Sequence, residues 1–165
     1  MSSKPVIITH RDQEQVLLRA DFSDKKTVAA LIKAGFTMPA DRRKESDAMW
    51  LSSDELLLFA DNAEATIKEI RPTLPPKHLI HDVSGARIVF SLEGDHLRDV
   101  FAKGAPRDMR NVVVGEVVRT RLGQVAVAFW LNSEAQAELI CFRSVADHVE
   151  AFLKMAAKPD GLPVL

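Results

Sequence analysis

Two histidines carry the spacing in this sequence that is most typical of a metal site. His78 and His81 are separated by two residues, which on a helix would place both imidazoles on one face. Pro75 and Pro76 lie just upstream and Ile80 is β-branched, so we expect an extended segment, in which the two rings point to opposite faces. A bound metal ion is therefore not expected here.

The sequence supports a catalytic nucleophile or a bound cofactor even less than it supports a metal site. Cys141 is the single cysteine, and it lies in an apolar run with no basic neighbour, which is typical of a core residue and not of a nucleophile. The sequence contains no G-x-G-x-x-G motif, no P-loop and no G-x-S-x-G motif. We therefore expect no catalytic residue, metal or cofactor in this chain.

Charge and composition narrow the class of protein. The 22 basic residues nearly balance the 23 acidic ones, whereas nucleic-acid-binding domains usually carry a basic excess. The longest apolar run is too short to span a membrane, and the apolar N-terminal stretch is too short for a signal peptide. A single cysteine excludes a disulfide framework and suggests a cytoplasmic setting. Residues 1–165 are expected to form one domain.

The elements that position these side chains are clearest between Val117 and Ala157. Val125–Leu131 is an uninterrupted apolar run rich in β-branched and aromatic residues, which predicts a buried strand. A second apolar run, Ala137–Phe142, completes a hairpin. Ser144 and Asp147 resemble a capping box and predict the start of an amphipathic helix.

The same order of elements occurs twice. Strand, helix, loop, hairpin and helix are predicted over residues 15–74 and again over residues 79–157. Gly35 and Gly104 each end the first helix of their half, and Trp50-Leu51-Ser52 corresponds to Trp130-Leu131-Asn132. We therefore predict an internal duplication of a ferredoxin-like β-α-β-β-α unit.

One further strand would complete each half, at residues 78–83 and at residues 162–165. Pro75 and Pro76 mark the internal boundary between the halves. The predicted fold class is α+β, with mostly antiparallel sheet and helices on one face.

The loop Gly104–Gly115 is the strongest candidate for contact with another protein. It contains a run of valines, Val112, Val113 and Val114, in an otherwise polar segment. Either these valines form an additional short strand or another chain covers them, and the sequence leaves both explanations open. In the second case the charged residues of the loop would form the rim of the interface. These residues are Arg107, Asp108 and Arg110.

Two arginines follow the loop. Arg119 and Arg121 are two positions apart on a predicted strand and therefore share one face. A solvated sheet face explains them, and a polar contact with a partner is the alternative. The two tryptophans, Trp50 and Trp130, are expected to pack in the core at equivalent positions.

Several of these segments resemble the gamma subunit of heterotetrameric bacterial sarcosine oxidase. They are L-E-G-D-H-L-R-D-V-F-A-K-G-A-P-R-D-M, G-E-V-V-R-T-R-L-G-Q-V-A-V-A-F-W, S-V-A-D-H-V-E-A-F-L and, in the first half, W-L-S-S-D-E-L-L-L-F. The resemblance covers residues 45–157. The wider relatives are folate-binding domains of the glycine-cleavage T-protein type, whose duplicated α+β fold agrees with the predicted repeat. Ala105 replaces a common cysteine of the family loop and Arg107 a common leucine, so no loop-specific role is carried over.

The resemblance implies a small accessory subunit of an oxidoreductase complex. Its partners would be the alpha, beta and delta subunits, of which the larger ones hold FAD, FMN and NAD and a small one holds zinc. Such a complex demethylates sarcosine to glycine, reduces oxygen to hydrogen peroxide and can pass the one-carbon unit to tetrahydrofolate. The family assigns no catalytic residue to the gamma subunit, so none is carried over.

Two other hypotheses about the function of the chain remain. One is a stand-alone folate-binding protein or folate-dependent aminomethyltransferase-like protein, which needs a carboxylate to bind the pterin inside an apolar cavity. Asp82 and Glu116 are candidates that the sequence does not distinguish. The other is an orphan domain with a different partner.

Overall fold

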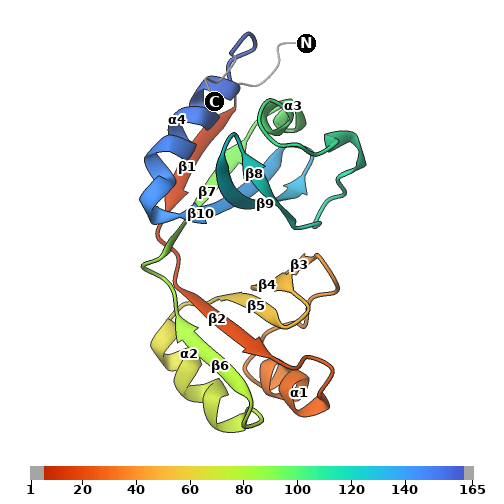
Figure 1. Cartoon of the computed structure of the whole chain (residues 1–165), viewed down its shortest axis with the longest axis vertical. Coiled ribbons are helices and arrows are strands. Elements are labelled where there is room, and N and C mark those ends of the chain that lie inside the picture. Colours follow the sequence, from red (N-terminus) through yellow and green to blue (C-terminus); the bar gives the residue numbers. More distant parts are fainter. Residues whose placement is uncertain (1–5, 162–165) are drawn as a thin grey trace. The chain divides into compact units, whose positions relative to one another are not determined.

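The computed structural model describes residues 6–161, and residues 1–5 and 162–165 lie outside this description. The chain divides into two compact units (Figure 1). We call Gln13–Ala86 the central unit, and Met1–Asp12 together with Arg87–Leu165 the composite unit.

The central unit is an antiparallel sheet with helices on one face. The strand order is β3-β4-β5-β2-β6. The elements are β2 (Gln15–Ala20), α1 (Lys25–Lys33), β3 (Lys44–Glu45), β4 (Ala48–Ser52), β5 (Glu55–Phe59), α2 (Ala63–Ile70), the 3₁₀ turn η1 (Arg71–Thr73) and β6 (His78–Asp82). Because side chains alternate along a strand, Val16 and Leu18 of β2 reach the same core as Leu31 of α1 and Ile70 of α2.

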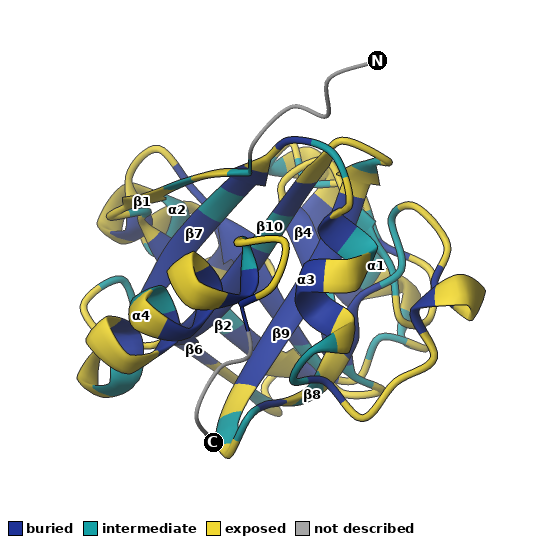
Figure 2. Ribbon diagram, turned by 90° about the horizontal axis from the view of Figure 1, so that it is seen from above, coloured by how far each residue is buried: buried dark blue, intermediate teal, exposed yellow. Residues whose placement is uncertain are grey.

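The composite unit repeats this arrangement with the strand order β1-β7-β10-β9-β8. The elements are β1 (Ile7–Arg11), β7 (Arg87–Glu93), α3 (Leu97–Ala102), the 3₁₀ turn η2 (Met109–Asn111), β8 (Val118–Leu122), β9 (Val125–Ser133), β10 (Gln136–Phe142), the 3₁₀ turn η3 (Arg143–Val145) and α4 (Ala146–Ala156). Figure 2 shows β7, β9 and β10 as largely buried, whereas α3 and α4 alternate between buried and exposed positions. This alternation is expected of amphipathic helices that cover one face of a sheet.

The predicted duplication is confirmed. In both units an initial strand is followed by a helix, three further strands and a second helix. The initial strand, β2 or β7, takes the same position in its sheet, next to the last strand of the hairpin, β5 or β10. The α+β class with mostly antiparallel sheet is therefore also confirmed.

The strand that completes each sheet comes from a different part of the chain. In the central unit β6 pairs with β2, and Leu18 lies opposite Ile80, as the predicted strand at residues 78–83 requires. In the composite unit the equivalent position beside β7 is taken by β1, with Thr9 opposite Ser91. The predicted strand at residues 162–165 lies outside the described residues. The chain crosses from one unit to the other after Asp12 and again after Ala86. The second crossing therefore lies after Pro75-Pro76, where the sequence predicts the boundary between the halves.

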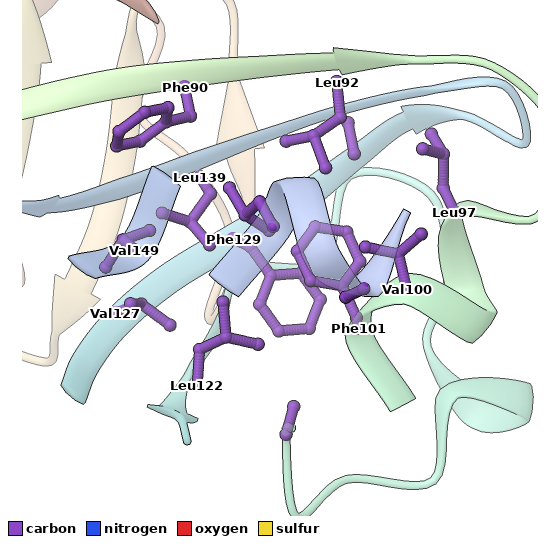
Figure 3. Packing of buried hydrophobic residues seen from close by; sticks show 14 of the residues in the cluster. Phe90, Leu92, Leu97, Val100, Phe101, Leu122, Val127, Phe129, Leu139 and Val149 are labelled. Carbon is purple, nitrogen blue, oxygen red and sulfur yellow. The ribbon is translucent and has the colours of Figure 1, made fainter. Parts of the chain in front are cut away.

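The core of the composite unit is built around two stacked phenylalanines. The rings of Phe101 from α3 and Phe129 from β9 lie 4.1 Å apart at an interplanar angle of 6° (Figure 3). Both side chains are completely buried, and Leu139 and Val149 belong to the same cluster. Helix α4 and the hairpin therefore share one core, as the pattern between Val117 and Ala157 predicts.

The predicted correspondence of the tryptophans is wrong by one residue. Trp50 packs against the core of the central unit, whereas the core residues of β9 are Val127, Phe129 and Leu131, which leaves Trp130 on the other face of its sheet. The strands β4 and β9 are equivalent and both pairings shift near the hairpin turn, but β4 ends two residues after Trp50, at Ser52, whereas β9 ends three residues after Trp130, at Ser133. Since side chains alternate with a period of two, a shift of one residue exchanges the faces.

The predicted capping box at Ser144 is also wrong. Ser144 lies inside η3, and α4 begins only at Ala146, without a hydrogen bond from a side chain at its N-terminus. The 3₁₀ turn provides an i→i+3 hydrogen bond from Ala146 N–H to the carbonyl of Arg143, which makes a side-chain cap unnecessary.

Within residues 6–161, no helix is long and apolar enough to cross a membrane.

Gly104 ends α3 because nothing larger fits there. A Cβ atom at this position would lie 2.2 Å from Cζ of the buried Phe152 ring of α4. We expect Gly104→Ala to lower the free energy of unfolding by about 1–3 kcal/mol through overpacking, measured by urea denaturation. Gly85→Ala is the matched control, because a Cβ there meets no atom within 4 Å. Equal stability of the two variants would contradict this account of Gly104.

Candidate partner-contact loop

The loop between α3 and β8 is folded tightly against its own unit. The Asp108 carboxylate accepts a hydrogen bond of 3.0 Å from the backbone N–H of Arg110 and so caps η2. Met109 and Val112 are buried in the core of the composite unit. The carbonyl of Gly104 accepts a 2.9 Å hydrogen bond from the N–H of Gly123, at the turn between β8 and β9.

The three valines have different environments. The described structure assigns no strand to residues 112–114. Val112 is 2% exposed, whereas Val113 is 56% and Val114 is 41% exposed. We call Val113 and Val114 the valine corner. Only these two side chains are accessible to a partner, because Val112 belongs to the core of this chain.

The charged residues around the valine corner pair with one another. Asp108 and Arg110 form two side-chain hydrogen bonds of 2.9 Å, which lower the pKa of the Asp108 carboxyl and raise the pKa of Arg110. Arg107 donates a 2.9 Å hydrogen bond to Glu116, and the other oxygen of Glu116 accepts from the N–H of Val113 at 3.2 Å. These two acidic and two basic groups therefore cancel in charge.

Arg98 of α3 holds the loop from the other side. Its Nε and Nη2 donate to the two carboxylate oxygens of Glu134, at 2.8 and 2.7 Å. Its Nη1 donates to the carbonyl of Val112 at 2.7 Å and also to the carbonyl of Met109. Hydrogen bonding to Glu134 raises the pKa of Arg98, and the same bonds lower the pKa of Glu134. We call Arg98 and Glu134 the clamp.

No pattern in the sequence indicates the clamp. Arg98 and Glu134 are 36 positions apart, on α3 and at the turn between β9 and β10. Neither residue belongs to a recognisable motif, and a salt bridge between distant positions leaves no periodic signal. Only the folded backbone brings them together.

Arg119 and Arg121 lie on β8, directly after the loop. Both are exposed, whereas Val118 and Leu122 at the ends of the strand are buried, so the two arginines share the face opposite the core. Strand β8 is at one edge of the described sheet. Both arginines therefore lie at this edge of the sheet, on the face away from the core.

Glu138 forms a second polar cluster that the sequence analysis missed. Its Oε1 accepts a 2.6 Å hydrogen bond from Arg11, which also donates to Ser91 at 2.8 Å. Its Oε2 accepts from the indole of Trp130 at 3.2 Å and from Asn132 at 3.3 Å. The cluster joins β1, β7, β10 and β9, so it ties the N-terminal strand to the rest of its sheet.

The residues first considered for chemistry have structural roles. His78 and His81 lie on the extended strand β6, and a ring nitrogen of His78 is 2.6 Å from the carbonyl oxygen of Pro75. Among residues 6–161, no group of three or more His, Cys, Asp or Glu side chains could hold a metal ion. Burial raises the pKa of the Cys141 thiol to about 11, so it stays protonated at neutral pH.

The two carboxylates considered for a pterin are engaged locally. Asp82 accepts hydrogen bonds from the N–H and hydroxyl of Ser84, at 2.8 and 2.5 Å, and these bonds lower its pKa. Glu116 is paired with Arg107, as described above. Both bonds from Ser84 fall on Oδ1 of Asp82, whereas each oxygen of Glu116 accepts a hydrogen bond.

Comparisons with known proteins support the fold through structures alone. The sequence matches no model of a protein family and no curated protein. The structure is similar to a chain of heterotetrameric sarcosine oxidase from Corynebacterium sp. U-96, with a TM-score of 0.84 and 24% identity over 97% of this chain and 87% of that chain.

Two more distant structures share the arrangement. Glycine cleavage system aminomethyltransferase T from Bartonella henselae gives a TM-score of 0.64 at 12% identity, over 90% of this chain and 45% of that chain. The regulatory subunit of aspartate kinase from Thermus thermophilus gives 0.52 at 13% identity, over 95% of this chain and 100% of that chain. The chain therefore has the duplicated α+β fold found in heterotetrameric sarcosine oxidase and in glycine-cleavage aminomethyltransferase T, and the resemblance noted in the sequence is confirmed at the level of the fold.

Proposed function

We propose that this chain is a non-catalytic, gamma-type accessory subunit of a sarcosine oxidase complex. The observation that supports this proposal best is the similarity in fold to a chain of a heterotetrameric sarcosine oxidase over nearly the whole length of both. On this proposal the chain acts in the cytoplasm beside alpha, beta and delta subunits. Those subunits hold FAD, FMN, NAD and zinc, and tetrahydrofolate accepts the one-carbon unit.

The valine corner is the proposed centre of contact with the large subunit. Val113 and Val114 are exposed, and charged side chains surround them, which is the usual anatomy of an interface with an apolar centre and a polar rim. The rim consists of Arg107, Asp108 and Arg110. Arg119 and Arg121 on β8 are further candidate contacts outside this rim, and Val112 supports the corner from inside the core.

Val113→Asp is expected to abolish association without unfolding the chain. A carboxylate at the centre of an apolar contact would have to be desolvated without a partner, whereas in the free chain it faces water. The measurement is a pull-down with the large flavoprotein subunit of the proposed complex, together with the melting temperature of the isolated chain.

The matched control is Ile32→Asp. Ile32 is 61% exposed on α1 of the central unit, so the same charge is added at a similar exposure in the other unit of the chain. The control should retain the partner. If the Val113→Asp variant still binds the partner, the valine corner is not the contact. If the melting temperature of this variant falls strongly, Val113 stabilises its own unit and is not a surface residue reserved for a partner.

The alternative function is that of a stand-alone folate-binding or aminomethyltransferase-like protein. The similarity to aminomethyltransferase T over 90% of this chain favours it. Calorimetric titration of the purified chain with tetrahydrofolate separates the two functions. Saturable binding by the isolated chain supports the alternative, whereas co-purification of flavoprotein subunits from the native host supports the accessory role.

A further inference from the structure

Arg98, a side chain of α3, holds the backbone that precedes the valine corner, while Glu116 accepts from the N–H of Val113. Arg98 donates to the carbonyls of Met109 and Val112, at the beginning of η2 and directly after it, while Glu134 fixes its guanidinium. We propose that Arg98 is a positioning residue, which presets the valine corner for an uncharged apolar pocket on the partner subunit. This inference rests on the proposed function.

The geometry of the clamp requires an arginine. A guanidinium is a planar fork that can donate to a carboxylate along one edge and still present Nη1 to carbonyl oxygens. Both carbonyls belong to the segment that precedes Val113, and the carbonyl of Val112 is part of the peptide bond to Val113. Fixing this peptide limits the directions in which the corner can point. A lysine, with one ammonium group, cannot make the same four contacts.

Presetting the loop affects association more than folding. A loop that is already ordered loses less conformational freedom when a partner binds, so the clamp raises affinity without touching the partner. Met109 and Val112 remain buried in the core whether or not the clamp is intact. Loss of the clamp should therefore loosen the corner and leave the fold in place.

The charges around the corner indicate the chemistry of the pocket. Arg107 is paired with Glu116 and Asp108 with Arg110, so the rim already satisfies its own charges. A partner needs no complementary charge there, and a strongly charged partner would compete with these pairs. The fitting surface is therefore an apolar protein pocket, and association through it should depend little on salt.

A second copy of this chain is the other candidate occupant. The hollow beside the clamp is lined mainly by polar and charged side chains, including Asp95, Asp99 and Glu134, which do not fit two valines. The hollow next to Lys158 and Asp160 also includes Met155 and Pro159, so the experiment must distinguish a second copy from the partner subunit.

The test compares clamp variants with a variant of the corner. Arg98→Lys and Glu134→Gln remove the fork and its anchor, Val113→Asp changes the corner, and Arg143→Lys is the control, because Arg143 pairs with Asp12 elsewhere in the same unit. Affinity for the large subunit is measured by surface plasmon resonance at low and high salt, at a temperature at which each variant is folded. Hydrogen exchange of the amides of residues 109–114 reports on the order of the loop.

We expect both clamp variants to bind about tenfold more weakly and to exchange these amides faster, with little dependence of affinity on salt. The control should match the unmodified chain. Full affinity of both clamp variants, combined with loss of binding in Val113→Asp, would overturn the role of Arg98 and leave the proposed interface intact. Full affinity of Val113→Asp would instead overturn the interface itself.

Two further results would overturn the proposed chemistry of the pocket. A steep fall of affinity with salt would show that charged groups dominate the contact. Self-association of the purified chain in size-exclusion chromatography, lost in Val113→Asp, would identify a second copy as the occupant.

Discussion

Phe129→Ala is expected to lower the free energy of unfolding by about 3–5 kcal/mol, the range for removal of a buried phenylalanine from a core. Phe129 is completely buried, and its ring is stacked on Phe101 at 4.1 Å. Removal of the ring leaves a cavity between β9 and α3 and withdraws the contact that orients Phe101. Such a loss is a large fraction of the stability of an ordinary domain. Urea denaturation followed by circular dichroism measures it.

Phe142→Ala is the matched control for this substitution. Phe142 lies on β10 of the same sheet but is 50% exposed, and its ring contacts the guanidinium of Arg87 at 5.2 Å. Its removal forfeits an exposed cation–π contact worth about 0.5–1 kcal/mol and leaves no internal cavity. Similar losses for both variants would show that the stacked pair is not the centre of the core.

Deletion of residues 1–12 is expected to destabilise the composite unit, because β1 completes its sheet from outside the segment 87–165. The deletion removes the pairing of β1 with β7 and the Arg11 contacts to Ser91 and Glu138. It also uncovers core residues that Ile8 packs against. Hydrogen exchange should show loss of protection in β7 and β10, and the melting temperature of this unit should fall.

A peptide of residues 1–12, added in trans, should restore protection in β7. The matched control is the same peptide with Ile8→Pro and Thr9→Pro. Neighbouring residues of a strand direct their N–H groups to opposite sides, so one of the two must face β7, and proline cannot donate a hydrogen bond. If the truncated chain melts like the full chain, β1 is dispensable and its place in the sheet has no energetic importance.

Local patterns explain why much of the fold was predictable. The apolar run Val125–Leu131 became β9, and the hairpin and helix that follow it depend mainly on contacts between neighbouring segments. The extended segment at His78 was predictable because proline restricts the residues around it. The repeat was visible because both units use the same order of elements.

Register and strand exchange were not predictable in the same way. The faces of Trp50 and Trp130 depend on how far each tryptophan lies from the end of its hairpin strand, and either residue is apolar enough for both faces of a strand. The strand that pairs with β1 is also hard to identify from sequence, because residues that meet in this pairing, such as Arg11 and Ser91, are 80 positions apart. Strand β1 lies at the edge of its sheet, and apolar and polar residues alternate only weakly along it. Its sequence therefore says little about which strand it pairs with.

For the candidate site, the sequence by itself determined the composition of the loop: an apolar run among charged residues, after a glycine that ends a helix. Only the tertiary structure decided that Val112 turns into the core and that Val113 and Val114 remain exposed. It also decided that Arg98, paired with Glu134, donates directly to the carbonyls of Met109 and Val112. The physical reason is that exposure and long-range hydrogen bonds depend on which distant segments occupy the surrounding space, whereas turns and caps depend on adjacent residues.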